Sequence, residues 1–266
     1  MLGAVIGDIV GSRFEADNLK SKEFDLFTKD SCPTDDSIMT LAVAKALLAS
    51  KEDWSQLSQN AVKYMQEIGR QYPDCGYGGH FFYWIFSDDP QPYGSYGNGS
   101  AMRISPVGFV ADSIEQAKAL SQAVTEVSHD HPEGLKGAEA VAVAIFLART
   151  GSSRHEIRDY IDKNYYSMDF TLDQIREDYS FDVTCQGSVP QAFQAFFESQ
   201  DFEDAIRNAI SIGGDSDTIA AICGGLAQAY YGIPAPIRNQ AMAYLDDCLV
   251  EIVEIFESIY PFQPNK

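Results

Sequence analysis

Apolar residues follow one another at helical spacing through most of the chain. The first segment, residues 1–12, is interrupted by one charged residue, Asp8, and predicts a buried helix that ends near Ser12. Gly3, Gly7 and Gly11 recur every four residues, so a helix would place them on one face where another backbone can approach closely. Either this segment is only a core helix that ends near Ser12, or the turn that follows it also places Glu15 in a cleft.

The remaining pattern predicts further helices and two loops. Continuous or periodic apolar residues predict helices at 33–47, 54–68, 114–127, 137–147, 187–197, 201–210, 213–221 and 236–260. Residues 16–32 and 72–100 are irregular and predict surface loops, while the mixed charges of 151–182 indicate an exposed helical layer. No stretch alternates long enough to require a strand. We therefore expect one all-α domain over residues 1–266, with nine to twelve helices.

Composition excludes several classes of protein. The formal charge of −20 and the pI near 4.4, with 19 Lys and Arg residues dispersed along the chain, argue against a nucleic-acid-binding surface. The N-terminal apolar segment is too short to span a membrane and lacks a basic flank. Five widely spaced cysteines without a CxxC pair indicate a reducing, cytoplasmic environment. We expect a monomer that does not bind membranes.

Two clusters of oxygen-bearing side chains begin predicted helices far apart in the sequence. They are Thr34, Asp35 and Asp36 in one cluster, and Asp215, Asp217 and Thr218 in the other. Carboxylates and hydroxyls without nearby Cys or His select hard cations, which favours magnesium or manganese over zinc. The simpler interpretation is a pair of helix caps, which use the same residue types. Paired acids in both places exceed what capping requires, and without a cation they would repel one another.

The glycine-rich loop offers a second kind of site. Gly97-Asn98-Gly99-Ser100-Ala101-Met102-Arg103 could present backbone N–H groups to a phosphate, although a tight turn packed on the core is the alternative. His129 follows an amphipathic helix and is two residues from His131. Ligands at that spacing point apart on a helix, so zinc is disfavoured and His129 is expected either to contact a ligand or to end the helix.

Five motifs in order resemble the ADP-ribosylhydrolase family, also called ADP-ribosylglycohydrolases. They are GDIVGSRFE at 7–15, TDD at 34–36, GNGSAMR at 97–103, SH at 128–129 and GDSDT at 214–218. The resemblance covers nearly the whole chain. It implies an all-α orthogonal bundle with a binuclear centre of two Mg²⁺ ions, or alternatively Mn²⁺, in a central cleft.

The same resemblance implies roles for individual residues. The metal ligands would be Thr34, Asp35, Asp36, Asp215, Asp217 and Thr218, and Glu15 would match the family's catalytic or gating glutamate. The substrate would contact Tyr96, Gly97, Asn98, Gly99, Ser100, Met102 and His129, with Asn98, Gly99 and Ser100 around the diphosphate. In relatives, the region equivalent to residues 16–33 can form a mobile lid.

The predicted activity is metal-dependent hydrolysis of the glycosidic bond between ADP-ribose and a modified acceptor. The acceptor could be arginine, serine, a nucleobase or a small molecule. One alternative is a non-catalytic ADP-ribose-binding or structural relative. Another is a dimetal nucleotide pyrophosphatase, whose usual ExxE carboxylate pairs are not visible near these clusters.

Overall fold

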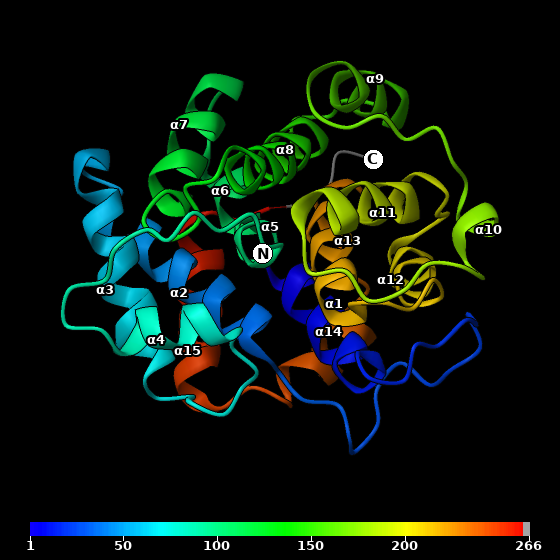
Figure 1. The fold of residues 1–266 in the computed structure, drawn as a ribbon, viewed down its shortest axis with the longest axis horizontal. Helices are drawn as coiled ribbons and strands as arrows, with labels where there is room; N and C mark the ends of the chain where they lie inside the picture. The colour runs from blue at the N-terminus through cyan, green and yellow to red at the C-terminus, as the bar shows by residue number, and fades with distance from the viewer. Residues whose placement is uncertain (263–266) are drawn as a thin grey trace.

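The computed structural model describes residues 1–262, which form fifteen α-helices and two short 3-10 helices (Figure 1). In chain order these are α1 (Leu2–Gly11), η1 (Ser12–Phe14), α2 (Asp35–Ser50), η2 (Trp54–Gln56), α3 (Leu57–Gly69), α4 (Gly79–Phe86), α5 (Gly99–Met102), α6 (Ser105–Val110), α7 (Ile114–Thr125), α8 (Pro132–Arg149), α9 (Arg154–Asn164), α10 (Leu172–Ile175), α11 (Cys185–Phe197), α12 (Phe202–Ile210), α13 (Ser216–Tyr231), α14 (Ala235–Met242) and α15 (Asp247–Ile259). Within these residues the only β-type pairing is an isolated bridge between Gly97 and Thr184.

The centre of the molecule is the contact between α1 and α13. Every residue of α1 is buried, and a Cβ added at Gly7 would lie 2.0 Å from the carbonyl oxygen of Ala220. At the end of α1, a Cβ on Gly11 would lie 2.5 Å from the Cα of Asp217. The glycine face predicted for the first helix is therefore the surface on which α13 packs, and it brings the Asp215–Asp217 segment close to the residues that follow α1.

The other helices surround this pair. Figure 1 shows α2 and α3 on one side of α1 and α13, with α11 and α12 on the other. The alanine-rich helix α8 has ten buried residues and packs against α13, α6 and α11. Helix α2 is buried over most of its length because its apolar residues run almost continuously from Ile38 to Leu47.

The helical content and most of the predicted helices are confirmed in the described residues, but the fifteen α-helices exceed the nine to twelve expected, and two segments differ. The region 72–100 was expected to be loop throughout, and the structure places α4 inside it. Helix α4 forms because Phe81, Trp84 and Ile85 recur at helical spacing and are buried together. The single helix expected over 236–260 is instead α14 and α15, separated by residues 243–246.

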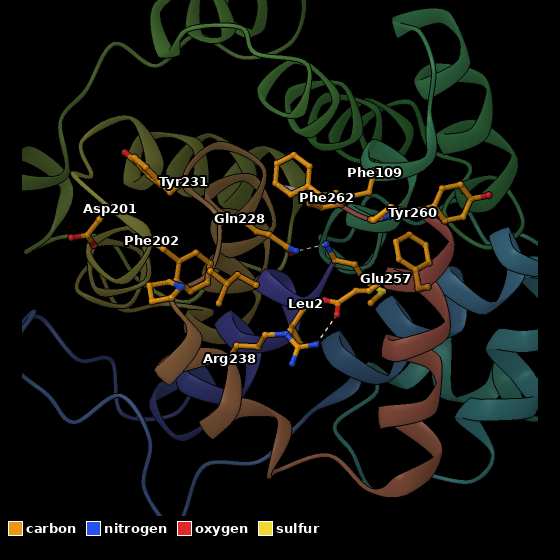
Figure 2. A pocket seen from close by; sticks show the side chains of 16 residues that line it. Leu2, Phe109, Asp201, Phe202, Gln228, Tyr231, Arg238, Glu257, Tyr260 and Phe262 are labelled. Carbon is orange, nitrogen blue, oxygen red and sulfur yellow. Dashed lines mark hydrogen bonds and ion pairs between the residues drawn. The ribbon is translucent and has the colours of Figure 1, made fainter. Parts of the chain in front are cut away.

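A large cavity opens at the N-terminal end of α1 (Figure 2). Its volume is about 830 Å³, and its wall includes the aromatic residues Phe109, Phe202 and Phe256. The charged groups Arg238 and Glu257 form an ion pair of 2.6 Å in this wall. Over the described residues, none of the helices is both long and apolar enough to cross a membrane.

Candidate active site

A second cavity, of about 380 Å³, lies beyond the other end of α1 and gathers residues from both predicted clusters. Carboxylates line one part of it, and aromatic and basic side chains line another. The lining residues are Glu15, Asp35, Asp36, Gly76, Gly78, Gly79, His80, Phe81, Tyr93, Ser95, Gly97, Asn98, Gly99, Met102, Arg103, His129, Phe181, Val183, Asp215, Asp217 and Thr218.

Asp8 organises the start of α2. Its Oδ1 accepts a hydrogen bond of 2.6 Å from the Thr34 hydroxyl, and its Oδ2 accepts from the backbone N–H groups of Thr34 and Ser37 at 2.9 and 3.0 Å. The Ser37 hydroxyl also donates to Oδ2. Sequence reasoning gave Asp8 no such role, although a single acid inside a buried apolar helix is a signal because a buried charge requires partners.

Four acids from different parts of the chain converge next to this anchor. Oxygens of Asp8, Asp36 and Asp217 lie within 4.8 Å of one another, and so do oxygens of Glu15, Asp215 and Asp217. Asp217 belongs to both groups, so the two groups are continuous. Asp36 and Asp217 are buried, and Glu15 is exposed at the end of η1.

The pKa values show that this arrangement strains the charged forms. Burial raises the pKa of Asp36 well above its ordinary value, and the carboxylate of Asp217 adds to the effect. Burial likewise raises the pKa of Asp217 well above its usual range, with Asp215 as the next cause. Burial raises the pKa of Asp8 to about 6 against the opposing hydrogen bonds from Ser37 and Thr34, and with the charge of Asp8 it raises the pKa of Asp35 to about 7.

These residues fit a divalent cation. The Oδ1 atom of Asp36 is buried without a hydrogen-bond partner in the described protein, which is a costly state for an isolated carboxylate. Its other oxygen accepts from the Thr218 hydroxyl at 3.3 Å. An all-oxygen donor set with several carboxylates and no Cys or His is the set that Mg²⁺ and Mn²⁺ prefer. The clustered acids could therefore bind metal.

The glycine-rich loop supports this site from the opposite wall. The Asn98 side chain donates hydrogen bonds of 2.7 Å to Asp215 Oδ2 and 3.0 Å to Ser188 Oγ. The Asn98 backbone N–H donates to the Val183 carbonyl at 2.8 Å, beside the Gly97–Thr184 bridge. The Asn98 amide thus holds one of the acids in place, while Gly97 and Gly99 form part of the cavity wall.

Arg103 and His129 form the basic part of the wall. Arg103 is fully buried, stacks its guanidinium 5.0 Å from the centre of the Phe81 ring, and donates a 2.7 Å hydrogen bond to Ser128 Oγ. Its Nε and Nη1 atoms have no partner in the described residues. Burial, and then the charge of Arg103, lower the pKa of His129 well below its ordinary value, so the imidazole is neutral at pH 7.

The structure brings most of the predicted site residues to one cavity. Eleven of the fourteen line it: Glu15, Asp35, Asp36, Gly97, Asn98, Gly99, Met102, His129, Asp215, Asp217 and Thr218. Thr34 is instead bonded to Asp8, and the buried Ser100 hydroxyl donates to the carbonyl of Gly134 at 2.9 Å. The Tyr96 ring lies 5.1 Å from that of His131 and is outside the lining set.

Several lining residues carried no prediction. Tyr93 takes the place in the wall expected for Tyr96, with its ring 5.6 Å from that of His129. Phe81 belongs to the unpredicted helix α4, and the exposed Phe181 lies in a segment interpreted as a solvated face. The aromatic richness of residues 77–96 was visible in the sequence, but which aromatic side chain faces the cavity depends on the tertiary structure.

Comparison with known proteins gives one consistent result. The sequence profile of the ADP-ribosylglycohydrolase family matches residues 1–261. The chain is 26% identical over 310 residues to ADP-ribosylhydrolase ARH3 of Homo sapiens, covering 88% of this chain and 84% of that protein. It is also 26% identical to ADP-ribosylarginine hydrolase Tri1 of Pseudomonas putida (strain GB-1), covering 88% and 70% of the two chains.

A solved structure described as an ADP-ribosylglycohydrolase-related protein complex has the same fold. It superposes with a TM-score of 0.69 at 22% identity, covering 97% of this chain and 94% of the other. The resemblance first seen in five short motifs is thus confirmed over almost the full length. The chain belongs to the ADP-ribosylglycohydrolase family.

Proposed function

We propose that this protein is a metal-dependent hydrolase that cleaves the glycosidic bond between ADP-ribose and a modified acceptor, releasing ADP-ribose. The observation that carries the proposal is the convergence of Glu15, Asp36, Asp215 and Asp217 at one part of a cavity of about 380 Å³. A cavity of that size matches a nucleotide-sized ligand. The names of the relatives support the reaction class.

The proposed metal ligands are the six predicted side chains, Thr34, Asp35, Asp36, Asp215, Asp217 and Thr218, with Asp8 holding Thr34 in position. Two Mg²⁺ or Mn²⁺ ions would supply positive charge that neutralises these acids and orients the hydroxyls of the distal ribose. Asn98 fixes Asp215 through its 2.7 Å hydrogen bond, so this ligand is already oriented before substrate binds.

The opposite part of the wall would hold the rest of ADP-ribose. Backbone groups of Gly97 and Gly99 can approach a diphosphate closely because these residues have no side chains. The charge of Arg103 is fully buried beside them, and it favours an anionic ligand in the cavity. Neutral His129 can donate or accept a hydrogen bond with its Nε2, since its Nδ1 lies 2.9 Å from the Ser128 hydroxyl.

Glu15 is the proposed catalytic residue. The bond between the anomeric carbon and the acceptor breaks through an oxocarbenium-like state, and water adds to that carbon. Glu15 orients this water and takes one of its protons, and that proton finally passes to the departing acceptor, which returns Glu15 to its charged form. Burial is the largest cause that raises the pKa of Glu15, and it makes Glu15 a stronger base than a free glutamate; the charges of Asp215 and Asp8 add to this effect only while no cation neutralises them.

The test is a substrate panel read by mass spectrometry. The full-length protein with Mg²⁺ or Mn²⁺ is expected to release ADP-ribose from one or more of the arginine-, serine-, nucleobase- and O-linked substrates. Asp217→Ala is expected to lose metal and activity, and Glu15→Ala to retain metal while losing activity. Binding of ADP-ribose without turnover would instead support a non-catalytic relative, and release of AMP would support a pyrophosphatase.

A further inference from the structure

The loop after α1 returns to the segment that carries the second acid cluster. This loop, residues 16–34, follows Glu15 and runs past α12 and α10, and it is the dark blue loop in Figure 1. Two side chains near its start, Asn18 and Lys20, contact the backbone of residues 212–214. Asp215 and Asp217 follow directly, so the loop touches the chain immediately before two proposed ligands.

The contacts are specific. Asn18 Oδ1 accepts a 2.9 Å hydrogen bond from the backbone N–H of Gly214. The Lys20 ammonium donates to the carbonyl of Ile212 at 2.6 Å and to the carbonyl of Tyr179. Each bond joins residues at least 159 positions apart in sequence. They therefore connect independently placed parts of the chain.

The local backbone is shaped for this contact. Asn18 has φ 49°, the only positive φ of a non-glycine residue in the described chain, and Gly213 and Gly214 have φ 68° and 72°. A Cβ on Gly213 would lie 2.2 Å from Asn18 Oδ1, so the side chain occupies the space that the glycine leaves. Asparagine tolerates this left-handed conformation better than most residues.

Asn18 is also tied rigidly to Glu15. The N–H groups of Asp17 and Asn18 donate to the carbonyl of Phe14 at 3.0 and 3.2 Å, which closes a compact turn around Glu15. Glu15 has oxygens within 4.8 Å of those of Asp215 and Asp217, and like charges at that distance repel. A fixed distance between Glu15 and the Asp215–Asp217 segment thus requires attachments elsewhere in the loop.

We propose that Asn18 and Lys20 are positioning residues that fasten the loop to residues 212–214 and so hold the Glu15 carboxylate against the Asp215–Asp217 segment. The inference rests on the proposed function, in which Glu15 orients the attacking water beside those ligands. Asn18 and Lys20 do not line the cavity, so their part in the reaction is to position Glu15 against that segment.

Asn18→Gly tests this role without straining the backbone. Glycine accepts φ 49° but removes the Oδ1 acceptor, whereas Asn18→Asp keeps an acceptor oxygen and also tolerates that φ. We expect Asn18→Gly to lower kcat roughly tenfold or more, because a misplacement of about 1 Å can cost ~100-fold. In Asn18→Gly, KM and the affinity for Mn²⁺ should change less than about twofold. Asn18→Asp should retain most of the wild-type kcat.

Lys20→Met should lower kcat in the same way, and Lys29→Met, an exposed lysine of the same loop, is the matched control with wild-type kcat. The proposal would be overturned by a wild-type kcat in Asn18→Gly or by an effect of that variant on KM alone. A kcat of Asn18→Asp as low as that of Asn18→Gly would also overturn it.

A second measurement separates the inference from the proposed function. If wild-type protein releases no ADP-ribose from any substrate, the proposed function fails, and hydrogen exchange at the Gly214 amide then decides about the attachment. Faster exchange at Gly214 in Asn18→Gly than in Asn18→Asp, at equal global stability, supports the attachment. Equal exchange in the two variants overturns it.

Discussion

The two cavities at opposite ends of α1 differ in how their polar groups are satisfied. The larger cavity, of about 830 Å³, has aromatic walls. In it Arg238 and Glu257 pair with each other, and the buried Met1 ammonium donates a 2.8 Å hydrogen bond to Gln228 Oε1. The smaller cavity, of about 380 Å³, contains acids with raised pKa values and an Asp36 oxygen without a hydrogen-bond partner in the described protein. Size alone would select the larger cavity, whereas the cluster of buried like charges selects the smaller one.

This difference indicates where binding energy is available. A cavity whose polar groups are already paired gains little electrostatic energy from a charged ligand. A cavity with buried like charges gains a great deal from a cation, because the cation removes repulsion and supplies the missing partner. Three substitutions and one change of pH test this difference between the cavities.

The largest effect should come from Gly7→Ala, which affects the helix that both cavities share. The added Cβ would lie 2.0 Å from the Ala220 carbonyl oxygen, so α1 and α13 must separate. We expect a loss of about 3 kcal/mol in the free energy of unfolding, at the upper end of what overpacking costs, measured by urea titration. Gly79→Ala, whose Cβ would meet nothing within 4 Å, is the control. Equal stability of the two variants would contradict the close packing of α1 on α13.

Asp36→Asn should distinguish the cavities by opposite effects on activity and on stability. Hydrolysis should fall by roughly 1,000-fold, since a proposed metal ligand is lost. In chelator at pH 8 the free energy of unfolding of the variant should be about 1 to 2 kcal/mol higher than that of wild type, because one of the buried like charges is gone. Added Mn²⁺ should raise the Tm of wild type but not of the variant.

Asp88→Asn replaces an exposed acid and is the control for that experiment. It should leave hydrolysis, the free energy of unfolding and the rise in Tm with Mn²⁺ unchanged. Equal stabilisation of Asp36→Asn and wild type by Mn²⁺ would place the cation elsewhere.

The pH dependence of stability should show the same strain. Asp8 has a pKa raised from 3.8 to about 6, and that of Asp35 is raised to about 7. The folded state therefore holds protons that the unfolded state releases, so in chelator the free energy of unfolding should fall as pH rises from about 4 to about 7. For Asp8 the loss is on the order of 3 kcal/mol. Urea titrations at pH 4, 5 and 8 with chelator measure it, and about half of the loss for Asp8 is expected between pH 5 and pH 8.

Saturating Mg²⁺ should weaken or reverse this trend, because the metal binds the deprotonated carboxylates. A wild-type protein that becomes more stable from pH 5 to pH 8 in chelator would show that the acids are not strained.

The sequence predicted the helical fold well because its signals are local or periodic. Gly3, Gly7 and Gly11 predicted a close helix contact, and the profile match over residues 1–261 confirms the family read from short motifs. The metal ligands and Glu15 stay predictions, although the structure brings most of them together.

The sequence did not predict which residues far apart along the chain contact each other. Asn98 was expected at a diphosphate, yet its side chain bonds Asp215, 117 residues away. Likewise Tyr93 rather than Tyr96 lines the cavity, and the Tyr96 ring packs against His131 instead. Both outcomes depend on tertiary contacts that no local pattern encodes.

The smallest effect is expected in the larger cavity. Glu257→Gln removes the ion pair with Arg238, and both side chains are about one-third exposed, at 34% and 36%. Water screens such a pair, so the free energy of unfolding should fall by less than about 1 kcal/mol. Glu254→Gln, an exposed acid on the same helix α15, is the matched control.

Hydrolysis and the Mn²⁺-dependent rise in Tm should be unchanged in Glu257→Gln, because α1 separates this pair from the acids around Asp217. A tenfold loss of activity in this variant would show that the two cavities are coupled through α1, and the buried acids would then no longer account for the function alone. An unchanged kcat, set beside the loss in Asp36→Asn, would localise the chemistry to the cavity that holds the clustered acids.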